Sequence, residues 1–189
     1  MTQTIAQIHA RFLPLIGNEY TLPVTANKGL PGTFLEGLLG IPHTPNCLDC
    51  SDGELKTIPV KESGGTFVPK ETIAVTMLSR EALQADDFNS SRCCIKMSKM
   101  LVVPYYRTGD TIRFMTPTII SRECSEFAEL YRILENDYNQ IRRDFIDHNN
   151  LSSRTGILLQ NRTKGRGHGS TTRAFYLRKE FVSRYVPLN

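Results

Sequence analysis

The chain has 189 residues, which suits one domain with a substantial core. It contains no run of about 18 apolar residues, so no transmembrane helix is expected. Its N-terminus does not read as a secretory signal, and its five cysteines are an odd number. We therefore expect an intracellular, cytoplasmic protein with reduced thiols.

The net charge of +4 is concentrated near the C-terminus. Residues 151–189 hold eight Lys or Arg side chains and one acid, Glu180, so they carry +7 and leave −3 for residues 1–150. A basic segment on a nearly neutral body favours a polyanionic partner such as nucleic acid. Within it, RTKGRGHGSTTR has the Gly and Ser content of a loop that could close around such a partner.

The spacing of apolar residues predicts one α+β domain with a central mixed β-sheet flanked by helices. Turn dipeptides such as Asp52-Gly53 separate the expected elements. In chain order these are a helix over 3–16, a helix over 33–40, a β-hairpin over 44–60, a strand within 72–78, a strand pair from 99–107 and 110–115, an amphipathic helix over 123–147, and a last strand pair from GILLQNR and RAFYLRKEF.

The stretch DGELKTIPV, at 52–60, carries the first chemical signal. In a strand, Glu54 and Lys56 point to one face and Leu55 to the other. If CLD is the preceding strand of the hairpin, Asp49 lies beside Glu54. Two carboxylates so placed can hold Mg²⁺, with the backbone carbonyl of Leu55 near the same ion. Lys56 would then orient the attacking water or offset charge on the attacked phosphate.

The identity of the aspartate stays open at this point. Asp52 lies two residues before Glu54 and would share its strand face, so it is the alternative to Asp49 as metal ligand. The turn signal at Asp52-Gly53 favours Asp49. The pattern of an Asp followed by Glu-x-Lys is short, and a surface strand would also satisfy it. Glu36, within an apolar segment, is either the solvent-facing position of a helix or part of a site.

Several segments together resemble the MutH-type DNA endonuclease family of the PD-(D/E)xK nuclease superfamily. That family contains the strand-nicking enzyme of DNA mismatch repair and type II restriction endonucleases that recognise GATC. The resemblance begins with NKGLPGTFLEGLLG and DGELKTIPV. It continues in CIKMSKMLVVPY, where a second functional lysine precedes an apolar strand, in GILLQNRTKG, which resembles the strand and loop that reach the bases, and in RAFYLRKEF, which resembles the C-terminal motif.

The resemblance implies a restriction-endonuclease-like fold, double-stranded DNA as partner and Mg²⁺ as cofactor, with Mn²⁺ as a substitute. It implies a catalytic core at about 27–120 and a DNA-reading segment at about 151–181 within a single domain, 1–189. The implied catalytic residues are Glu36, Asp49, Glu54, Lys56 and Lys96; the metal ligands are Asp49 (or Asp52), Glu54 and the Leu55 carbonyl; the DNA-binding residues are Lys28, Arg162, Lys164, Arg166, Arg173 and Tyr176.

The sequence therefore predicts a Mg²⁺-dependent endonuclease that cuts double-stranded DNA at GATC or a similar short site, as a monomer or transient dimer. One alternative is a strand-nicking enzyme of the mismatch-repair type that needs an activating protein. Another is a DNA-binding module without catalysis. A third is a structural zinc protein built on Cys47, Cys50, Cys93 and Cys94, although neighbouring cysteines on a strand would point apart and chelate poorly.

Overall fold

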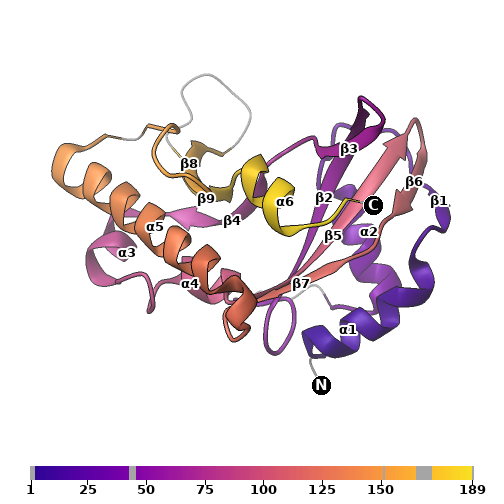
Figure 1. Ribbon diagram of the computed structural model, residues 1–189, viewed down its shortest axis with the longest axis horizontal. Helices are drawn as coiled ribbons and strands as arrows, with labels where there is room; N and C mark the ends of the chain where they lie inside the picture. Colours follow the sequence, from indigo (N-terminus) through magenta and orange to yellow (C-terminus); the bar gives the residue numbers. More distant parts are fainter. Residues whose placement is uncertain (1–2, 43–45, 151, 165–171, 189) are drawn as a thin grey trace.

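The structure, a computed structural model, describes residues 3–42, 46–150, 152–164 and 172–188. The chain forms an α+β domain (Figure 1). The helices are α1 (Ile5–Phe12), α2 (Leu30–Leu39), α3 (Arg80–Ala85), α4 (Arg92–Met97), α5 (Ala128–His148) and α6 (Lys179–Tyr185), with 3₁₀ turns η1 (Leu13–Leu15) and η2 (Ser125–Phe127). The strands are β1 (Glu19–Thr21), β2 (Glu54–Ser63), β3 (Thr66–Pro69), β4 (Ile73–Leu78), β5 (Lys99–Thr108), β6 (Thr111–Phe114), β7 (Thr118–Ser121), β8 (Leu159–Thr163) and β9 (Arg173–Leu177).

Six of these strands form the predicted central mixed sheet. Its order is β1-β6-β5-β2-β3, and β7 pairs with the opening part of β5. The two longest strands, β2 and β5, run parallel with Glu54 opposite Met100, and the other pairs are antiparallel. This parallel pair is the centre of the sheet, and it places the start of β2 next to the end of α4.

The remaining strands form a second, antiparallel sheet in the order β4-β9-β8. Figure 1 shows α5 beside this sheet and α1 and α2 beside the six-stranded sheet, at opposite sides of the molecule. Residues 70–72, between β3 and β4, connect the two sheets. The two sheets share an apolar cluster, which contains Ile58 and Met100 of the first sheet and Val75 and Phe175 of the second, so they belong to one domain.

Two apolar clusters form the core on the two faces of β5. Met100 and Val102 face a cluster with α4, α5 and α6, whereas Leu101 and Val103 face a cluster with α1 and α2. This alternation is the period of two that a strand imposes. Because both faces are covered, β5 reads as a continuous apolar run in the sequence, as buried parallel strands do.

The helix boundaries follow local sequence signals. Thr4 caps α1 by accepting a hydrogen bond from the Gln7 backbone N–H, and the Gln7 side chain accepts one in return. Pro31 lies in the first turn of α2, where its missing N–H is tolerated. Gly40 ends α2 in the left-handed conformation, with φ of 67°.

The predicted hairpin over 44–60 is wrong. In the described part of that segment, residues 46–53 form bends rather than a strand. The hairpin partner of β2 is β3, and the tight turn is at Gly64-Gly65, where φ is 59° and 77°. Cys93 and Cys94 lie on helix α4 instead of a strand, and both are buried.

Two further features bear on the class of protein. Within the described residues, no helix is long and apolar enough to span a bilayer. Among the same residues, no three His, Cys, Asp or Glu side chains gather as a metal site, so the zinc alternative gains no support there.

Candidate active site

Glu54 is the centre of the candidate site. It is the first residue of β2, its side chain is only 1% exposed, and both of its carboxylate oxygens accept from lysines. The Lys56 Nζ lies 2.6 Å from Oε2, and the Lys96 Nζ donates to Oε1. A carboxylate this deeply buried would be strongly destabilising without such partners.

The lysines reach Glu54 from different elements. Lys56 follows Glu54 by two residues on β2, so strand alternation puts both side chains on one face, as predicted. Lys96 lies in the last turn of α4, directly before β5. Because β5 pairs in parallel with β2, the end of α4 lies over the start of β2. The sheet thus brings together residues 42 positions apart.

Asp49 joins this cluster. Its Oδ2 accepts a hydrogen bond of 3.1 Å from the Leu55 backbone N–H, and its carboxyl also bonds to that of Glu54. Burial, the bond to Glu54 and the charge of Glu54 together raise the pKa of Asp49 to about 6. The predicted proximity of Asp49 and Glu54 is confirmed, although a bent loop provides it rather than a strand.

The pKa of Glu54 is shifted in the opposite direction from that of Asp49. Burial would raise its pKa, but the Lys56 charge and the hydrogen bonds from Asp49, Lys56 and Lys96 outweigh burial and leave the pKa below its ordinary value. The two carboxyl groups therefore have different pKa values, as interacting acids in one site do. Glu54 holds the negative charge, and Asp49 carries the proton more readily.

Asp52, the alternative ligand, points to other partners. Its Oδ1 accepts from the Ile5 backbone N–H at 2.7 Å, and its Oδ2 pairs with Lys99 Nζ at 2.6 Å. These contacts join the loop to the start of α1 and to β5. The structure thus brings Asp49, and not Asp52, to Glu54.

Gly53 explains why this loop has its shape. A Cβ on Gly53 would lie 2.5 Å from the Lys99 backbone oxygen and 2.7 Å from Ile5 Cγ1. Only glycine lets the loop approach β5 and α1 so closely. The Asp52-Gly53 dipeptide, predicted to be a hairpin turn, instead packs the loop against its neighbours.

The donor set fits a hard divalent cation. Asp49 and Glu54 present adjacent carboxyl groups, and burial, the hydrogen bond between the two and the charge of Glu54 all raise the pKa of Asp49. The N–H and C=O of a strand residue lie on the same side of the strand, so the Leu55 carbonyl is on the side of Asp49. Mg²⁺ prefers oxygen ligands of these kinds and few protein ligands in total.

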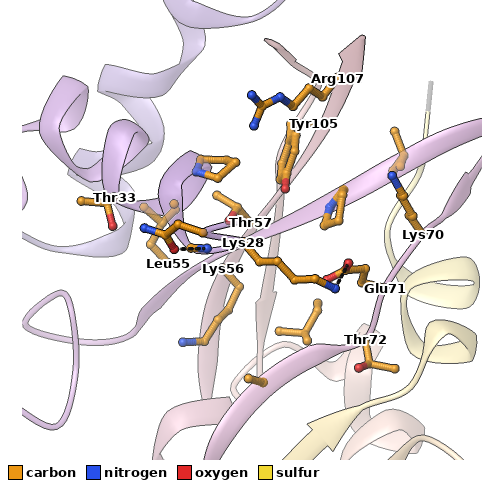
Figure 2. Close-up of a pocket in the computed structure, with 18 of the residues that line it drawn as sticks. Lys28, Thr33, Leu55, Lys56, Thr57, Lys70, Glu71, Thr72, Tyr105 and Arg107 are labelled. Carbon is orange, nitrogen blue, oxygen red and sulfur yellow. Dashed lines mark hydrogen bonds and ion pairs between the residues drawn. The ribbon is translucent and has the colours of Figure 1, made fainter. Parts of the chain in front are cut away.

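A pocket of about 570 Å³ opens beside this cluster (Figure 2). Leu55 and Lys56 of β2 and Glu36 of α2 line it, whereas Asp49, Glu54 and Lys96 are not in its lining. A Cβ on Gly32 would lie 3.3 Å from Thr57 Oγ1, so glycine lets the first turn of α2 approach β2 closely. Glu36 lies one turn further along α2.

A second pocket, of about 820 Å³, adjoins the first. The two share lining residues from 27–29 and 70–74, so they form one groove. Three predicted DNA-binding residues line only its far half: Arg162 of β8, Lys164 directly after β8, and Tyr176 of β9. The guanidinium of Arg162 lies 5.8 Å from the centroid of the Tyr176 ring, an arrangement that can present both to a base.

The other predicted DNA-binding residues differ in position. Lys28 lines both halves of the groove and pairs with Glu71 at 2.7 Å (Figure 2). Arg173 donates to Asn161 Oδ1 at 2.7 Å and lines neither half, so it supports β8 instead of facing the groove. Arg166 lies outside the described residues.

The sequence reasoning missed the segment between the two sheets. The Lys70 backbone N–H donates to the Pro59 carbonyl, Glu71 pairs with Lys28, and Thr72 Oγ1 accepts from Arg162 at 3.2 Å. The three residues line the groove where its halves meet. Nothing in the local pattern of PKET marks these contacts, because their partners come from elsewhere in the chain.

A mixed sheet flanked by helices, with an Asp and Glu-x-Lys at the start of its inner strand β2, is consistent with a nuclease of the restriction-endonuclease-like kind. Comparison with known families supports this class. The family model for the DNA mismatch repair enzyme MutH matches residues 45–144, just over half of the chain. The chain belongs to this family and is thereby assigned to the DNA endonucleases, with DNA as its partner. No curated protein matches the chain.

Proposed function

We propose that this protein is a Mg²⁺-dependent endonuclease that hydrolyses phosphodiester bonds in double-stranded DNA at a short specific sequence, GATC or a similar one. One observation carries the proposal: the cluster of Asp49, Glu54, Lys56 and Lys96 lies beside a groove whose far half is lined by basic and aromatic side chains. A reaction centre next to a basic groove suits a polyanionic substrate. Mn²⁺ is the expected substitute.

The cluster residues have distinct roles in this proposal. Asp49, Glu54 and the Leu55 carbonyl would hold the Mg²⁺ ion. As a Lewis acid, the ion would polarise the phosphate and activate the attacking water. Lys56 lines the pocket, so its ammonium can orient that water and stabilise charge on the phosphate. Lys96 can do the same from the α4 side. Glu36 would support the site from α2.

The groove would position the DNA. Lys28 would bind a backbone phosphate between the two halves, and Lys164 would add charge at the far end. Arg162 and Tyr176 would read a base edge, since an Arg side chain pairs well with guanine. Residues at about 27–120 would then form the catalytic core, and those at about 151–181 the DNA-reading segment.

A second candidate activity is strand nicking of the mismatch-repair type. The printed description of the matching family, a DNA mismatch repair enzyme, favours it. In that case one chain cuts one strand, and an activating protein partner is needed. For cleavage of both strands, two chains would meet transiently on a palindromic site.

The test is a plasmid cleavage assay with Mg²⁺, using DNA with and without adenine methylation at GATC. Lys56→Ala is compared with the wild type, and Lys61→Ala serves as the matched control because Lys61 is exposed at the far end of β2. We expect discrete linear fragments from the wild type and Lys61→Ala. Lys56→Ala should cut at least about 100-fold more slowly, since it lacks one stabilising charge.

The form of the product separates the two activities. Conversion to nicked circles alone would support the mismatch-repair type. Failure of a folded, DNA-binding wild type to cut either DNA would reject the restriction-type activity, and leave a DNA-binding module or a nicking enzyme that needs its activating partner. Equal activity of Lys56→Ala and Lys61→Ala would reject the role of Lys56.

A further inference from the structure

The Lys28–Glu71 ion pair lies in the middle of the groove. Lys28 precedes α2, Glu71 lies between β3 and β4, and their charged atoms are 2.7 Å apart. Both residues line both halves of the groove. Figure 2 shows the two side chains meeting across the pocket. A cation that lies between the two halves of the groove is therefore paired with an acid of the same groove.

We infer that Glu71 is an intramolecular substitute for a DNA phosphate: its carboxylate occupies Lys28 in the free protein and must give way when DNA enters. The inference rests on the proposed function, in which Lys28 binds the DNA backbone. A carboxylate and a phosphate offer an ammonium group the same kind of contact, which is a charge-assisted hydrogen bond. A phosphate and a carboxylate held by the same ammonium group would repel each other, because both are negatively charged.

The pair has the properties that such an exchange requires. The Lys28 side chain is 75% exposed and that of Glu71 is 35% exposed. Both charges are therefore in contact with solvent, and neither needs the other to offset the cost of burial. An exposed pair of this kind is weak and easily broken. The contrast with Glu54 is clear, because its buried carboxylate has two lysine partners and cannot lose them at low cost.

The neighbours of Glu71 add to the argument. Thr72, the next residue, accepts a hydrogen bond from Arg162, so the same segment holds a phosphate-binding and a base-reading side chain. Tyr105 lines the cleavage half of the groove, and its pKa is raised chiefly by burial and secondly by the charge of Glu71. Glu71 thus acts as a negative charge inside a groove that otherwise favours DNA, and it lowers the affinity for any duplex.

The experiment measures binding of a fluorescent duplex of random sequence by anisotropy, without divalent metal and over a range of salt concentrations. Glu71→Gln should bind about two- to five-fold more tightly than the wild type, because DNA no longer breaks the ion pair. Its affinity should fall more steeply with salt, by up to about one unit of slope. Glu71→Ala should behave in the same way.

Two further variants isolate the cause. In a Lys28→Ala background, Glu71→Gln should have no effect on affinity, since the contact it frees is gone. Glu62→Gln removes the same charge from an exposed site on β2 outside the groove and should leave the affinity unchanged.

The inference is overturned if Glu71→Gln binds the duplex no more tightly than the wild type does. It is also overturned if the gain in affinity persists in the Lys28→Ala background, because the gain would then be a general effect of charge. If the wild type cuts plasmid but Glu71→Gln shows no gain in duplex affinity, this inference alone is rejected and the proposed function stands. A folded wild type that neither cuts nor binds DNA rejects the proposed function and this inference with it.

Discussion

The raised pKa of Asp49 would make Mg²⁺ binding at the proposed site depend on pH, in a range where ordinary aspartates do not titrate. Burial and the neighbouring Glu54 raise this pKa from 3.8 to about 6, whereas the pKa of Glu54 lies below its ordinary value. A carboxyl group must lose its proton to bind Mg²⁺. The proton on Asp49 would therefore compete with Mg²⁺, whereas Glu54, with its lowered pKa, would be ionised over the same pH range.

The size of the effect follows from the ionised fraction. With a pKa of about 6, roughly one Asp49 in ten is ionised at about pH 5 and roughly nine in ten at about pH 7. The apparent Mg²⁺ affinity should therefore be about tenfold lower at the acidic end. An aspartate with the ordinary value of 3.8 would change by less than about 10% over the same interval.

The free energy of unfolding of the metal-free protein should fall with rising pH, whereas the Mg²⁺ affinity should rise. A group whose pKa is raised by folding stabilises the fold while it is protonated, and this contribution is lost as the pH rises from about 4 through about 6. Near neutral pH, the metal-free Asp49→Asn protein should be at least as stable as the wild type. The amide keeps an oxygen to accept from Leu55 but adds no charge beside Glu54.

Isothermal titration with Mg²⁺ between about pH 5 and pH 8 measures the affinity, and urea unfolding without metal measures the stability. Asp49→Asn is the control, because its residual affinity should not depend on a proton at this position. Equal Mg²⁺ affinity of the wild type across the range would refute the coupling of Asp49 to Glu54. The same slope in Asp49→Asn would assign the pH dependence to another group.

Two further variants test how the site is held in place. Gly53→Ala should lower the free energy of unfolding by about 1–3 kcal/mol, because its Cβ would lie 2.5 Å from the Lys99 carbonyl oxygen, whereas Gly37→Ala, with nothing within 4 Å, should be neutral or slightly stabilising. Urea unfolding of both variants checks this, and equal effects would contradict the packing argument. Asp137→Ala should destabilise by at least about 3 kcal/mol, since this buried carboxylate accepts from the backbone N–H groups of three consecutive residues, Ile157, Leu158 and Leu159, at the start of β8. The exposed Asp147→Ala on the same helix should have almost no effect, and comparable losses in the two would show that the three hydrogen bonds contribute little.

The sequence predicted the parts of the fold that have a strong local pattern. The helix expected at 123–147 is α5, Ala128–His148, whose apolar positions recur every three or four residues. The expected strand pair at 99–107 and 110–115 is β5 and β6. Short elements with little apolar content were missed, among them β1 and α3, because neighbours across the fold stabilise them rather than their own pattern.

The candidate site was predicted in composition but only partly in geometry. Strand alternation placed Glu54 and Lys56 together from their spacing alone. The loop that carries Asp49 could not be derived from the pattern, because its shape depends on the close approach of Gly53 to β5 and α1. Lys96 and Glu71 meet their partners only through the tertiary fold, and for Lys96 the family resemblance supplied what spacing could not.

The parallel pairing of β2 with β5 also affects how the protein folds. The contact between Glu54 and Lys96 spans 42 positions, and parallel strands need a long crossover before they can pair. Contacts of this kind form late, because the loop must close first. During synthesis, a chain whose β2 has left the ribosome while α4 and β5 have not contains Asp49 and Glu54 but still lacks Lys96. The capacity to cut DNA should therefore appear only after the central sheet is complete, which makes cleavage a sensitive reporter of the final stage of folding.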